Sequence, residues 1–537
     1  MNNKMVSNLQ KLLIASAAVI SLAFIAAVTL PLLTQKNDTQ QLHVLVIDAL
    51  TKTKLSTGTV QLDVDGKLYA TATVKDGYAR FDNVPKGTIT VRATSEGFKQ
   101  FVQTFTPQPK EASRLVLAPL EKQTTTQPTI PSGPALKASF LIVSNKQNLE
   151  AKYGIDIAQQ VEIEMTELAR IVQQNDNIAS IAVMLDDDAE MKKLAATTVT
   201  SSQSNDPDAA LRSIRSVLAS TGAKYLLIVG GDKIVPFQKI RNPMSDFPGP
   251  IGAFLVQEDP LVLTDHPYSF LQCDNEADKC NPAIAVGRLP DGNEEKSTST
   301  TLADLLLASQ KLHSQNIQKP SEVATTVSAD SIAPYYSNNN FELAGPQKIA
   351  PPTKIANLAG FNEPGSIENV RQFISNHEIV YLSVHGNLPL EPQALEGRMP
   401  DGEGRALVIN TQIAKDFEYK TALFVSDACH GSNPNRKEED ALWMQFLRKG
   451  AVGFVGSTMT ALSDARVAQK TFDTETDIQN LGLSNTVAYF MIKNYRKGET
   501  TGDALMHAKT LLKNNNPADR LTNLEFILYG DPTLHAT

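Results

Sequence analysis

Short apolar runs alternate with helical patterns from residue 138 to the C-terminus. The runs are rich in branched side chains and include FLIVS (140–144), YLLIVGG (225–231), EIVYLSVHG (378–386) and TALFVSDAC (421–429). Segments between such runs, among them 155–174 and 209–221, repeat apolar residues at helical spacing. Nearly continuous apolar strands separated by helices are typical of parallel sheets covered on both faces. We therefore predict an α/β fold, with a mostly parallel sheet flanked by helices, for residues 138–537.

Residues 42–119 show a different pattern, which predicts a small antiparallel β-sandwich. Its short runs alternate polar and apolar residues or carry β-branched side chains, and Gly and Asp turns separate them. Asp76-Gly77-Tyr78, Phe81 and the Pro85-x-Gly87 turn resemble the carboxypeptidase regulatory-like domain. That resemblance implies a transthyretin-like sandwich. The stretch holds no catalytic cluster, so we interpret it as a spacer module. Residues 120–137, rich in Thr, Pro and Gln, are interpreted as a semi-extended linker.

The N-terminal segment 1–37 predicts a membrane anchor. The run from Leu12 to Leu33 carries no charge, and its length is close to the ~20 residues that span a bilayer as a helix. Lys4 and Lys11 precede it, which places the N-terminus in the cytoplasm and the catalytic domain outside. A cleavable signal peptide, followed by secretion, is the alternative, although its apolar core is usually shorter. Both interpretations export the rest of the chain.

Charge and cysteine content narrow the partners and the compartment. The formal net charge is -8, so no electrostatic argument favours nucleic-acid binding. Cys273 and Cys280 lie in the polar stretch CDNEADKC and would pair in an oxidising compartment, although two free loop thiols remain an open alternative. In either case Cys429 is left without a cysteine partner, and an odd cysteine in an exported protein is a candidate reactive thiol.

Two of the apolar runs end in residues with catalytic chemistry: His385-Gly386 and Cys429. Active sites of α/β sheets form at the carboxyl ends of strands. A cysteine nucleophile needs a base, and His385 is the candidate. The N–H groups of Gly386 and Cys429 are candidate oxyanion donors. The adjacent His430 is interpreted as a bystander, because successive residues point to opposite sides. The alternatives are a buried inert cysteine and a His-Gly turn.

The order of several motifs resembles the gingipain family of caspase-like cysteine peptidases. The matching segments are YLLIVGGDKIVP (225–236), LTDHPYSF with PAIAVGRLP (282–290), DACHG (427–431), AVGFVGSTMTA and FILYGDPTL (526–534). The resemblance covers residues 138–537. It implies a caspase-like fold, with His385 as base beside Gly386 and Cys429 as nucleophile. The family also uses an acidic residue to assist the histidine, and Asp330 is a weak candidate for that role.

Asp427, two residues before the cysteine, predicts the specificity. In caspase-like enzymes this position tends to line the pocket for the residue before the scissile bond, and a carboxylate there would pair with Arg or Lys. A structural carboxylate bonded to backbone amides is the alternative. The resemblance also points to Glu342 as an acidic pocket residue. Trp443 and Ser457 are weaker candidates for pocket walls.

These observations predict a membrane-anchored, extracytoplasmic cysteine endopeptidase that cleaves proteins or peptides after Arg or Lys. The alternatives are a catalytically silent adhesion or scaffold protein, and a transpeptidase that uses the same thioester. We expect no required cofactor and no catalytic metal. A structural Ca²⁺ at Asp186-Asp187-Asp188 competes with the interpretation of that stretch as a solvated charge run.

Overall fold

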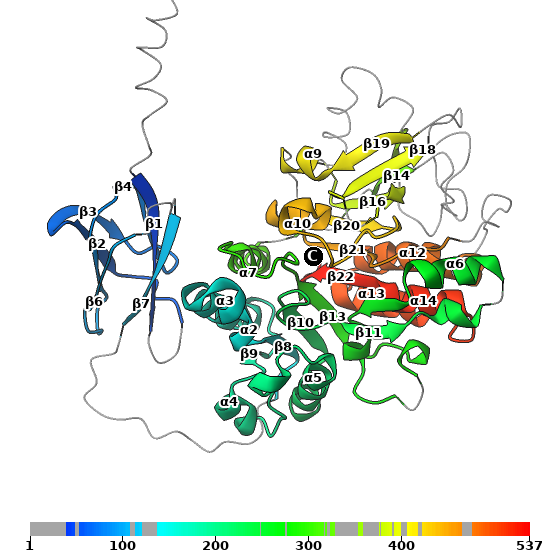
Figure 1. Cartoon of the computed structure of the whole chain (residues 1–537), viewed down its shortest axis with the longest axis horizontal. Helices are drawn as coiled ribbons and strands as arrows, with labels where there is room; N and C mark the ends of the chain where they lie inside the picture. Colours follow the sequence, from blue (N-terminus) through cyan, green and yellow to red (C-terminus); the bar gives the residue numbers. More distant parts are fainter. Residues whose placement is uncertain are drawn as a thin grey trace, which may run out of the picture. The chain divides into compact units, whose positions relative to one another are not determined.

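The computed structural model divides the chain into two compact units, Met1–Pro128 and Thr129–Thr537 (Figure 1). No helix among the described residues is long and apolar enough to cross a membrane. The predicted anchor and most of the predicted linker lie outside those residues. The structure describes residues 39–48, 53–107, 113–120, 137–247, 249–273, 276–315, 317–318, 320, 323–327, 353–357, 375, 377–388, 391–398, 405–416, 421–463 and 475–536.

The first unit is an all-β sandwich built around apolar residues that alternate along its strands. One sheet has the order β4-β1-β7 and the other has the order β3-β2-β5-β6. β6 was not predicted from the sequence, and β1 pairs with β7 in parallel, so the sandwich is not purely antiparallel as expected. The strands are β1 (Thr39–Asp48), β2 (Thr59–Val64), β3 (Lys67–Thr73), β4 (Tyr78–Pro85), β5 (Ile89–Thr94), β6 (Phe101–Phe105) and β7 (Ser113–Leu120).

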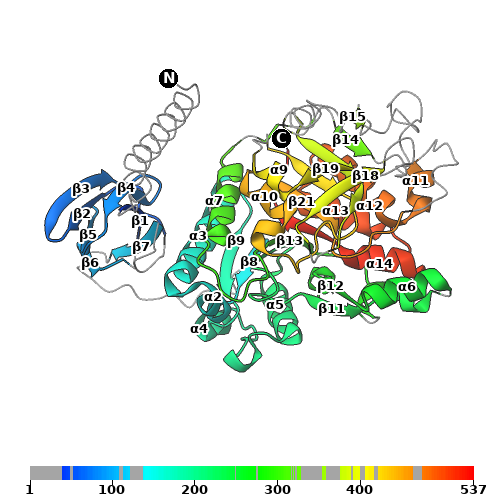
Figure 2. The ribbon, with the colours of Figure 1, turned by 45° about the horizontal axis from the view of Figure 1, so that its top comes forward.

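The second unit contains a ten-stranded sheet with the order β15-β14-β16-β20-β21-β22-β13-β10-β8-β9. Helices flank this sheet (Figure 2), so the predicted α/β fold with a mostly parallel sheet is confirmed. The strands are β8 (Phe140–Ser144), β9 (Ser180–Met184), β10 (Tyr225–Val229), β13 (Ala285–Leu289), β14 (Val323–Val327), β15 (Thr353–Asn357), β16 (Ile379–Ser383), β20 (Leu423–Ser426), β21 (Gly453–Ser457) and β22 (Phe526–Gly530).

The large sheet consists of two parallel halves that run in opposite directions. β21 pairs with β22 antiparallel, whereas every other neighbouring pair in this sheet is parallel. The carboxyl ends of β16, β20 and β21 therefore lie at the same edge as the start of β22. Residues that precede β22 can thus reach the carboxyl ends of the other half.

Helices pack on both faces of the sheet because successive strand residues point to opposite sides. In β16, Val380 and Leu382 join a core cluster with α10, whereas Ile379 and Tyr381 join a second cluster with α12 and α13. The helices are α2 (Lys146–Tyr153), α3 (Ile155–Asn175), α4 (Asp188–Lys193), α5 (Pro207–Thr221), α6 (Pro250–Glu258), α7 (Thr301–His313), α9 (Thr411–Lys415), α10 (Leu442–Arg448), α11 (Glu475–Leu481), α12 (Leu483–Arg496), α13 (Thr501–Thr510) and α14 (Pro517–Glu525).

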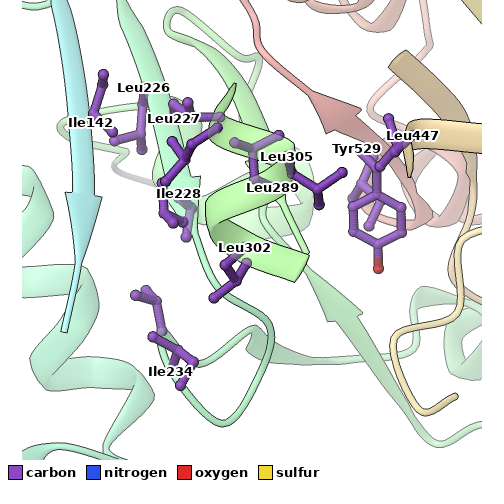
Figure 3. Close-up of a cluster of buried hydrophobic side chains, with 14 of the residues drawn as sticks. Ile142, Leu226, Leu227, Ile228, Ile234, Leu289, Leu302, Leu305, Leu447 and Tyr529 are labelled. Atoms are coloured by element: carbon purple, nitrogen blue, oxygen red, sulfur yellow. The ribbon is translucent and has the colours of Figure 1, made fainter. Parts of the chain in front are cut away.

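Part of the first cluster lies between β8, β10 and α7 (Figure 3). Leu227, Leu302 and Leu305 there are at most 3% exposed. Local signals fix the ends of the neighbouring helix α5. Asp206 accepts a hydrogen bond from the Asp208 N–H at its start, and Gly222 ends it in the left-handed conformation.

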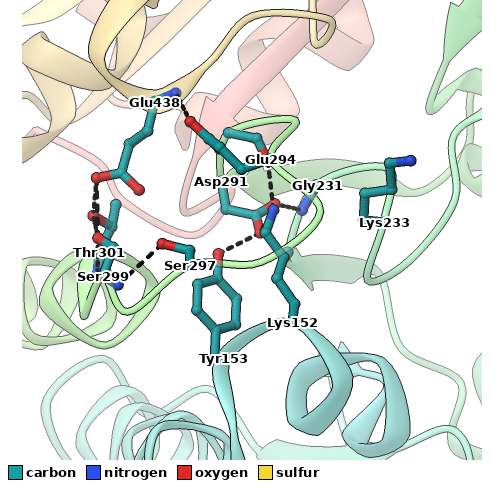
Figure 4. Close-up of polar contacts among 12 residues, drawn as sticks. Lys152, Tyr153, Gly231, Lys233, Asp291, Glu294, Ser297, Ser299, Thr301 and Glu438 are labelled. Carbon is teal, nitrogen blue, oxygen red and sulfur yellow. Dashed lines mark hydrogen bonds and ion pairs between the residues drawn. The ribbon is translucent and has the colours of Figure 1, made fainter.

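A buried ion pair ties the loops that follow β8, β10 and β13 together (Figure 4). Lys152 Nζ lies 2.7 Å from Asp291 Oδ2, and both side chains are almost fully buried. Asp291 also accepts hydrogen bonds from the Tyr153 hydroxyl and from the Gly231 N–H. Gly231 is the last residue of the sequence Val229-Gly230-Gly231, and its N–H therefore binds a carboxylate of the protein itself. The network continues where the Glu438 N–H donates to Glu294 at 2.8 Å.

The acidic triplet 186–188 distributes its carboxylates over separate partners. Asp186 accepts the N–H groups of Lys146 and Gln147, each at 2.8 Å. Asp187 caps α4, and Asp188 pairs with Lys192. Across the described part of the chain, no group of three or more His, Cys, Asp or Glu residues could hold a metal ion.

Candidate active site

The strands that carry the predicted base and nucleophile are neighbours. β16 and β20 pair in parallel, with Tyr381 opposite Val425 and Leu382 opposite Ser426. Their carboxyl ends therefore meet at one edge of the sheet. Just beyond β16, the short strand β17 (His385–Gly386) pairs antiparallel with β18 (Ala394–Arg398), which continues to β19 (Arg405–Asn410). This small sheet fixes the backbone of the His-Gly pair beside the end of β20.

Gly386 packs directly against the backbone of Cys429. A Cβ atom built on Gly386 would overlap the Cys429 carbonyl oxygen, and would lie 3.0 Å from the carbonyl carbon and 3.4 Å from the amide nitrogen. Only glycine fits this approach without a shift of one backbone segment. The two strand ends predicted from sequence to form one site therefore touch through their main chains.

Cys429 carries a free, partly buried thiol. Its Sγ lies 3.9 Å from the carbonyl oxygen of Ala461, a weak S–H···O contact. Burial raises the pKa of the Cys429 thiol to about 11, and the charges of Glu525, Asp427 and Glu258 act in the same direction. The resting group is thus a thiol at neutral pH, and a base must remove its proton when it attacks.

Asp427 is held by two hydroxyl groups from the neighbouring strand. Its Oδ2 accepts hydrogen bonds from Tyr381 at 2.7 Å and from Ser383 at 3.2 Å. Burial raises the pKa of the Asp427 carboxyl to about 6, although these hydroxyls and the charge of His385 act to lower it. A backbone hydrogen bond of Asp427 itself also acts to lower its pKa, so the structural alternative remains open beside the predicted role in specificity. The carboxylate is ionised near neutral pH and lies beside the nucleophile.

A second carboxyl lies behind the nucleophile. Glu525 ends α14, immediately before β22, and is fully buried. The described residues give neither of its oxygens a well-formed hydrogen bond. Burial raises the pKa of Glu525 and lowers that of the nearby Lys509. Glu525 therefore opposes formation of a thiolate at Cys429 only to the extent that its own carboxyl is ionised.

Two residues predicted as pocket walls are fully buried instead. Trp443 has no exposed surface, and its ring packs 4.4 Å from the ring of Tyr529 between centroids. The indole lies in the core because α10 covers the sheet face with this side of the helix. Ser457 is also fully buried, and its hydroxyl donates to the Met459 carbonyl at 2.8 Å. Both residues support the site from inside rather than line its surface.

His430, which we predicted to be a bystander, has its ring among partners other than Cys429. Its backbone is left-handed, with φ of 54°, and its side chain is buried. The ring nitrogens lie 3.4 Å from Asn433 Nδ2 and 3.4 Å from Thr460 Oγ1. Burial lowers the pKa of His430, so the ring is neutral at pH 7.

Four predicted residues remain. They are two cysteines that the structure describes and two acidic residues that lie outside the described residues. Cys273 and Cys280 are joined in a disulfide. Asp330 and Glu342 lie outside the described residues. The strand that precedes Asp330, β14, pairs with β16 on the side opposite β20.

Sequence analysis missed the groups that surround the two catalytic candidates. Tyr381 and Ser383 lie two residues apart in β16, and this period-two spacing, which His385 continues just beyond the strand, was available in the sequence. Glu525 and Thr460 have no such signal, because their approach to Cys429 depends on the antiparallel β21–β22 pair and on the loop after β21.

Comparison with known proteins gives a family match over most of the second unit. The model of peptidase family C25 matches residues 188–537, and this confirms the resemblance to gingipains predicted from the sequence. No curated protein matches the chain.

Solved structures give more distant similarities. The Arg-specific cysteine proteinase gingipain R is 12% identical, with a TM-score of 0.45, over 75% of this chain and 80% of that chain. The complex of the pro- and mature domains of RgpB from Porphyromonas gingivalis is 13% identical, with a TM-score of 0.44, over 74% and 79%. A pilus backbone protein of group B streptococcus is 14% identical, with a TM-score of 0.15, over 16% and 42%.

Proposed function

The chain belongs to peptidase family C25, and from this membership we propose that it is an endopeptidase in which Cys429 is the nucleophile and His385 the base. The observation that carries the proposal is the contact between the two strand ends. Gly386, which follows the base, packs against the backbone of the only free cysteine among the described residues. A silent scaffold has no need of this close approach.

The reaction proceeds through a thioester. His385 accepts the thiol proton as Cys429 Sγ forms a bond to the carbonyl carbon of the substrate. The carbonyl oxygen becomes an oxyanion, which the N–H groups of Gly386 and Cys429 stabilise. His385 then donates the proton to the leaving amine as the C–N bond breaks. Water, deprotonated by His385, attacks the thioester, and the products are a carboxylic acid and the regenerated thiol.

The raised pKa of the thiol supports proton transfer during the attack rather than a preformed ion pair. A thiol with a pKa of about 11 is almost fully protonated at pH 7, so His385 acts as a general base in the acylation step.

We propose that Asp427 selects substrates with Arg or Lys before the scissile bond. Its carboxylate lies two residues before the nucleophile, and the hydroxyls of Tyr381 and Ser383 hold it in place. Each hydroxyl donates to Oδ2, which leaves Oδ1 available to a guanidinium or ammonium group.

Hydrolysis of peptide libraries tests the activity and the specificity together. Wild-type protein is expected to cleave after Arg or Lys, and Cys429→Ala is expected to reduce turnover to background. Cys273→Ser/Cys280→Ser is the matched control, because it replaces the two disulfide-bonded cysteines and leaves the Cys429 thiol in place. Undiminished turnover by Cys429→Ala would refute the proposal, and an inactive wild type would favour the scaffold alternative.

We further propose that the peptidase unit lies outside the cytoplasm, anchored by residues 12–33, with the sandwich as a regulatory-like spacer. The disulfide between Cys273 and Cys280 supports an oxidising compartment. N-terminal sequencing of the mature protein distinguishes an intact anchor from a cleaved signal, and protease protection of the second unit in intact cells would contradict export.

A further inference from the structure

One segment after β21 connects helix α6 to the nucleophile. The Thr460 hydroxyl donates a hydrogen bond to Glu258 Oε2 at 3.1 Å. The next residue, Ala461, accepts the weak contact from Cys429 Sγ at 3.9 Å. Glu258, the last residue of α6, is thus held beside the catalytic thiol although it lies far from it in the sequence.

The position of α6 is fixed by a separate apolar cluster. Leu255 packs there with Met459, Leu521 and Leu524 from the loop after β21 and from α14. Met459 also accepts the N–H of His430 at 2.7 Å, which links this cluster to the nucleophile loop. The inner side of α6 is therefore anchored to the same loops that carry Cys429.

The outer side of α6 presents an aromatic ring and a carboxylate. Phe254 is 60% exposed, and Glu258 is also exposed. Residues four apart on a helix lie on the same face, so the ring and the carboxylate are neighbours. Phe254 is one of several exposed large hydrophobic side chains, and it is distinguished by its position one turn before Glu258, which the Thr460–Ala461 segment connects to Cys429.

The charge of Glu258 indicates which kind of substrate group would bind to the outer face of α6. Among the described residues, no Lys or Arg forms an ion pair with Glu258, whose hydrogen bond is to the neutral Thr460. Asp427 adds a second carboxylate whose charge acts on the same thiol. A guanidinium can stack on a phenyl ring while it pairs with a carboxylate, and an ammonium makes the same contacts less well.

We propose that Phe254 and Glu258 form a second subsite, which binds another basic side chain of the peptide substrate. The subsite rests on the proposed peptidase function, with Asp427 binding the first basic residue. Peptides with two basic residues near the scissile bond are then cleaved faster than peptides with one. The outer face of α6 is the specificity-determining surface for the second residue.

Paired peptides test the subsite in the active enzyme. Each peptide carries Arg before the scissile bond, and a second Arg is moved through the neighbouring positions with Ala as the reference. At one position the wild type is expected to gain about 5- to 10-fold in kcat/KM, a typical effect of one partly desolvated charge pair. Glu258→Gln should abolish this gain, measured within the variant as the ratio of kcat/KM for double-Arg and single-Arg peptides, because loss of a charge that acts on the Cys429 thiol affects both peptides alike. Asp156→Asn, an exposed acid on α3, is the matched control and should retain the gain.

Two further variants separate recognition from folding. Thr460→Val removes the hydroxyl that holds Glu258 and should reduce the gain partially. Phe254→Ala should reduce the gain for a second Arg more than for a second Lys. Equal losses on single- and double-basic peptides in Glu258→Gln, or no gain at any position in the wild type, would overturn the proposal.

Peptide binding to the inactive Cys429→Ala protein tests the subsite independently of catalysis. Fluorescence anisotropy of labelled double-Arg peptides is measured with Cys429→Ala and with Cys429→Ala/Glu258→Gln. A 5- to 10-fold weaker Kd in the double variant supports the subsite even if the wild type fails to hydrolyse peptides. Equal Kd values would refute it while leaving the proposed peptidase function intact.

Discussion

Gly386 and Cys429 meet main chain to main chain at the ends of two neighbouring parallel strands. The space between them excludes even a methyl group, because a Cβ on Gly386 would overlap the Cys429 carbonyl oxygen. The position of the candidate base relative to the candidate nucleophile therefore depends on a glycine at residue 386.

Gly386→Ala is expected to reduce kcat/KM by at least about 10²-fold, because a displacement of ~1 Å at a catalytic group has effects of this size. The backbone of one strand end must move to admit the methyl group. Peptide hydrolysis measures the loss, and thermal unfolding shows whether the variant still folds. A folded variant with wild-type activity would show that the approach is not needed.

Alkylation of Cys429 by iodoacetamide is expected to be slow at pH 7 and to accelerate up to a midpoint near pH 11. The thiolate is the reactive form, and the pKa of this thiol is raised to about 11 because burial disfavours the charge. The second-order rate constant is measured against pH by mass spectrometry, with Cys429→Ala as the unlabelled control. A plateau reached below pH 8 would instead indicate a preformed thiolate–imidazolium pair.

Cleavage after Arg is expected to weaken as the pH falls below about 6, where Asp427 becomes neutral and no longer pairs with the guanidinium. The ratio of kcat/KM for Arg and citrulline peptides isolates this effect, because the two peptides differ in the charge of that one side chain. The ratio should fall up to about tenfold per pH unit below the midpoint.

Tyr381→Phe should move the midpoint of that ratio to higher pH, since the Tyr381 hydroxyl stabilises the ionised carboxylate. Tyr225→Phe is a matched control that breaks a tyrosine–aspartate hydrogen bond to Asp503 instead. A ratio that does not change with pH in the wild type would remove Asp427 from substrate recognition.

Asp291→Asn is expected to destabilise the second unit by about 3–5 kcal/mol, because it leaves the buried Lys152 ammonium without its counter-charge. Asp188→Asn breaks an exposed pair with Lys192 and should change the free energy of unfolding far less, because solvent screens the two charges. Urea unfolding of both variants measures the difference. Equal effects would show that burial does not govern the strength of these pairs.

The α/β fold could be predicted from the sequence because its strands are apolar on both faces. The same apolar runs predicted the strand ends at His385 and Cys429. The surroundings of Cys429 could not be predicted, because they come from distant segments that only the completed sheet brings together. Trp443 illustrates what the sequence leaves undecided. The sequence is consistent with a pocket wall or with a core residue at this position, and the packing of Trp443 against Tyr529 shows that it is a core residue.

The antiparallel joint between β21 and β22 also sets the order in which the site is assembled. β22 separates the two halves of the sheet, and the residue just before it, Glu525, lies behind the thiol. During synthesis the His385 and Cys429 strands leave the ribosome well before residue 530, and until that strand inserts they lack the neighbour that joins them to the first half. The ten-stranded sheet that carries the candidate site is therefore complete only when β22, near residue 530, has joined it.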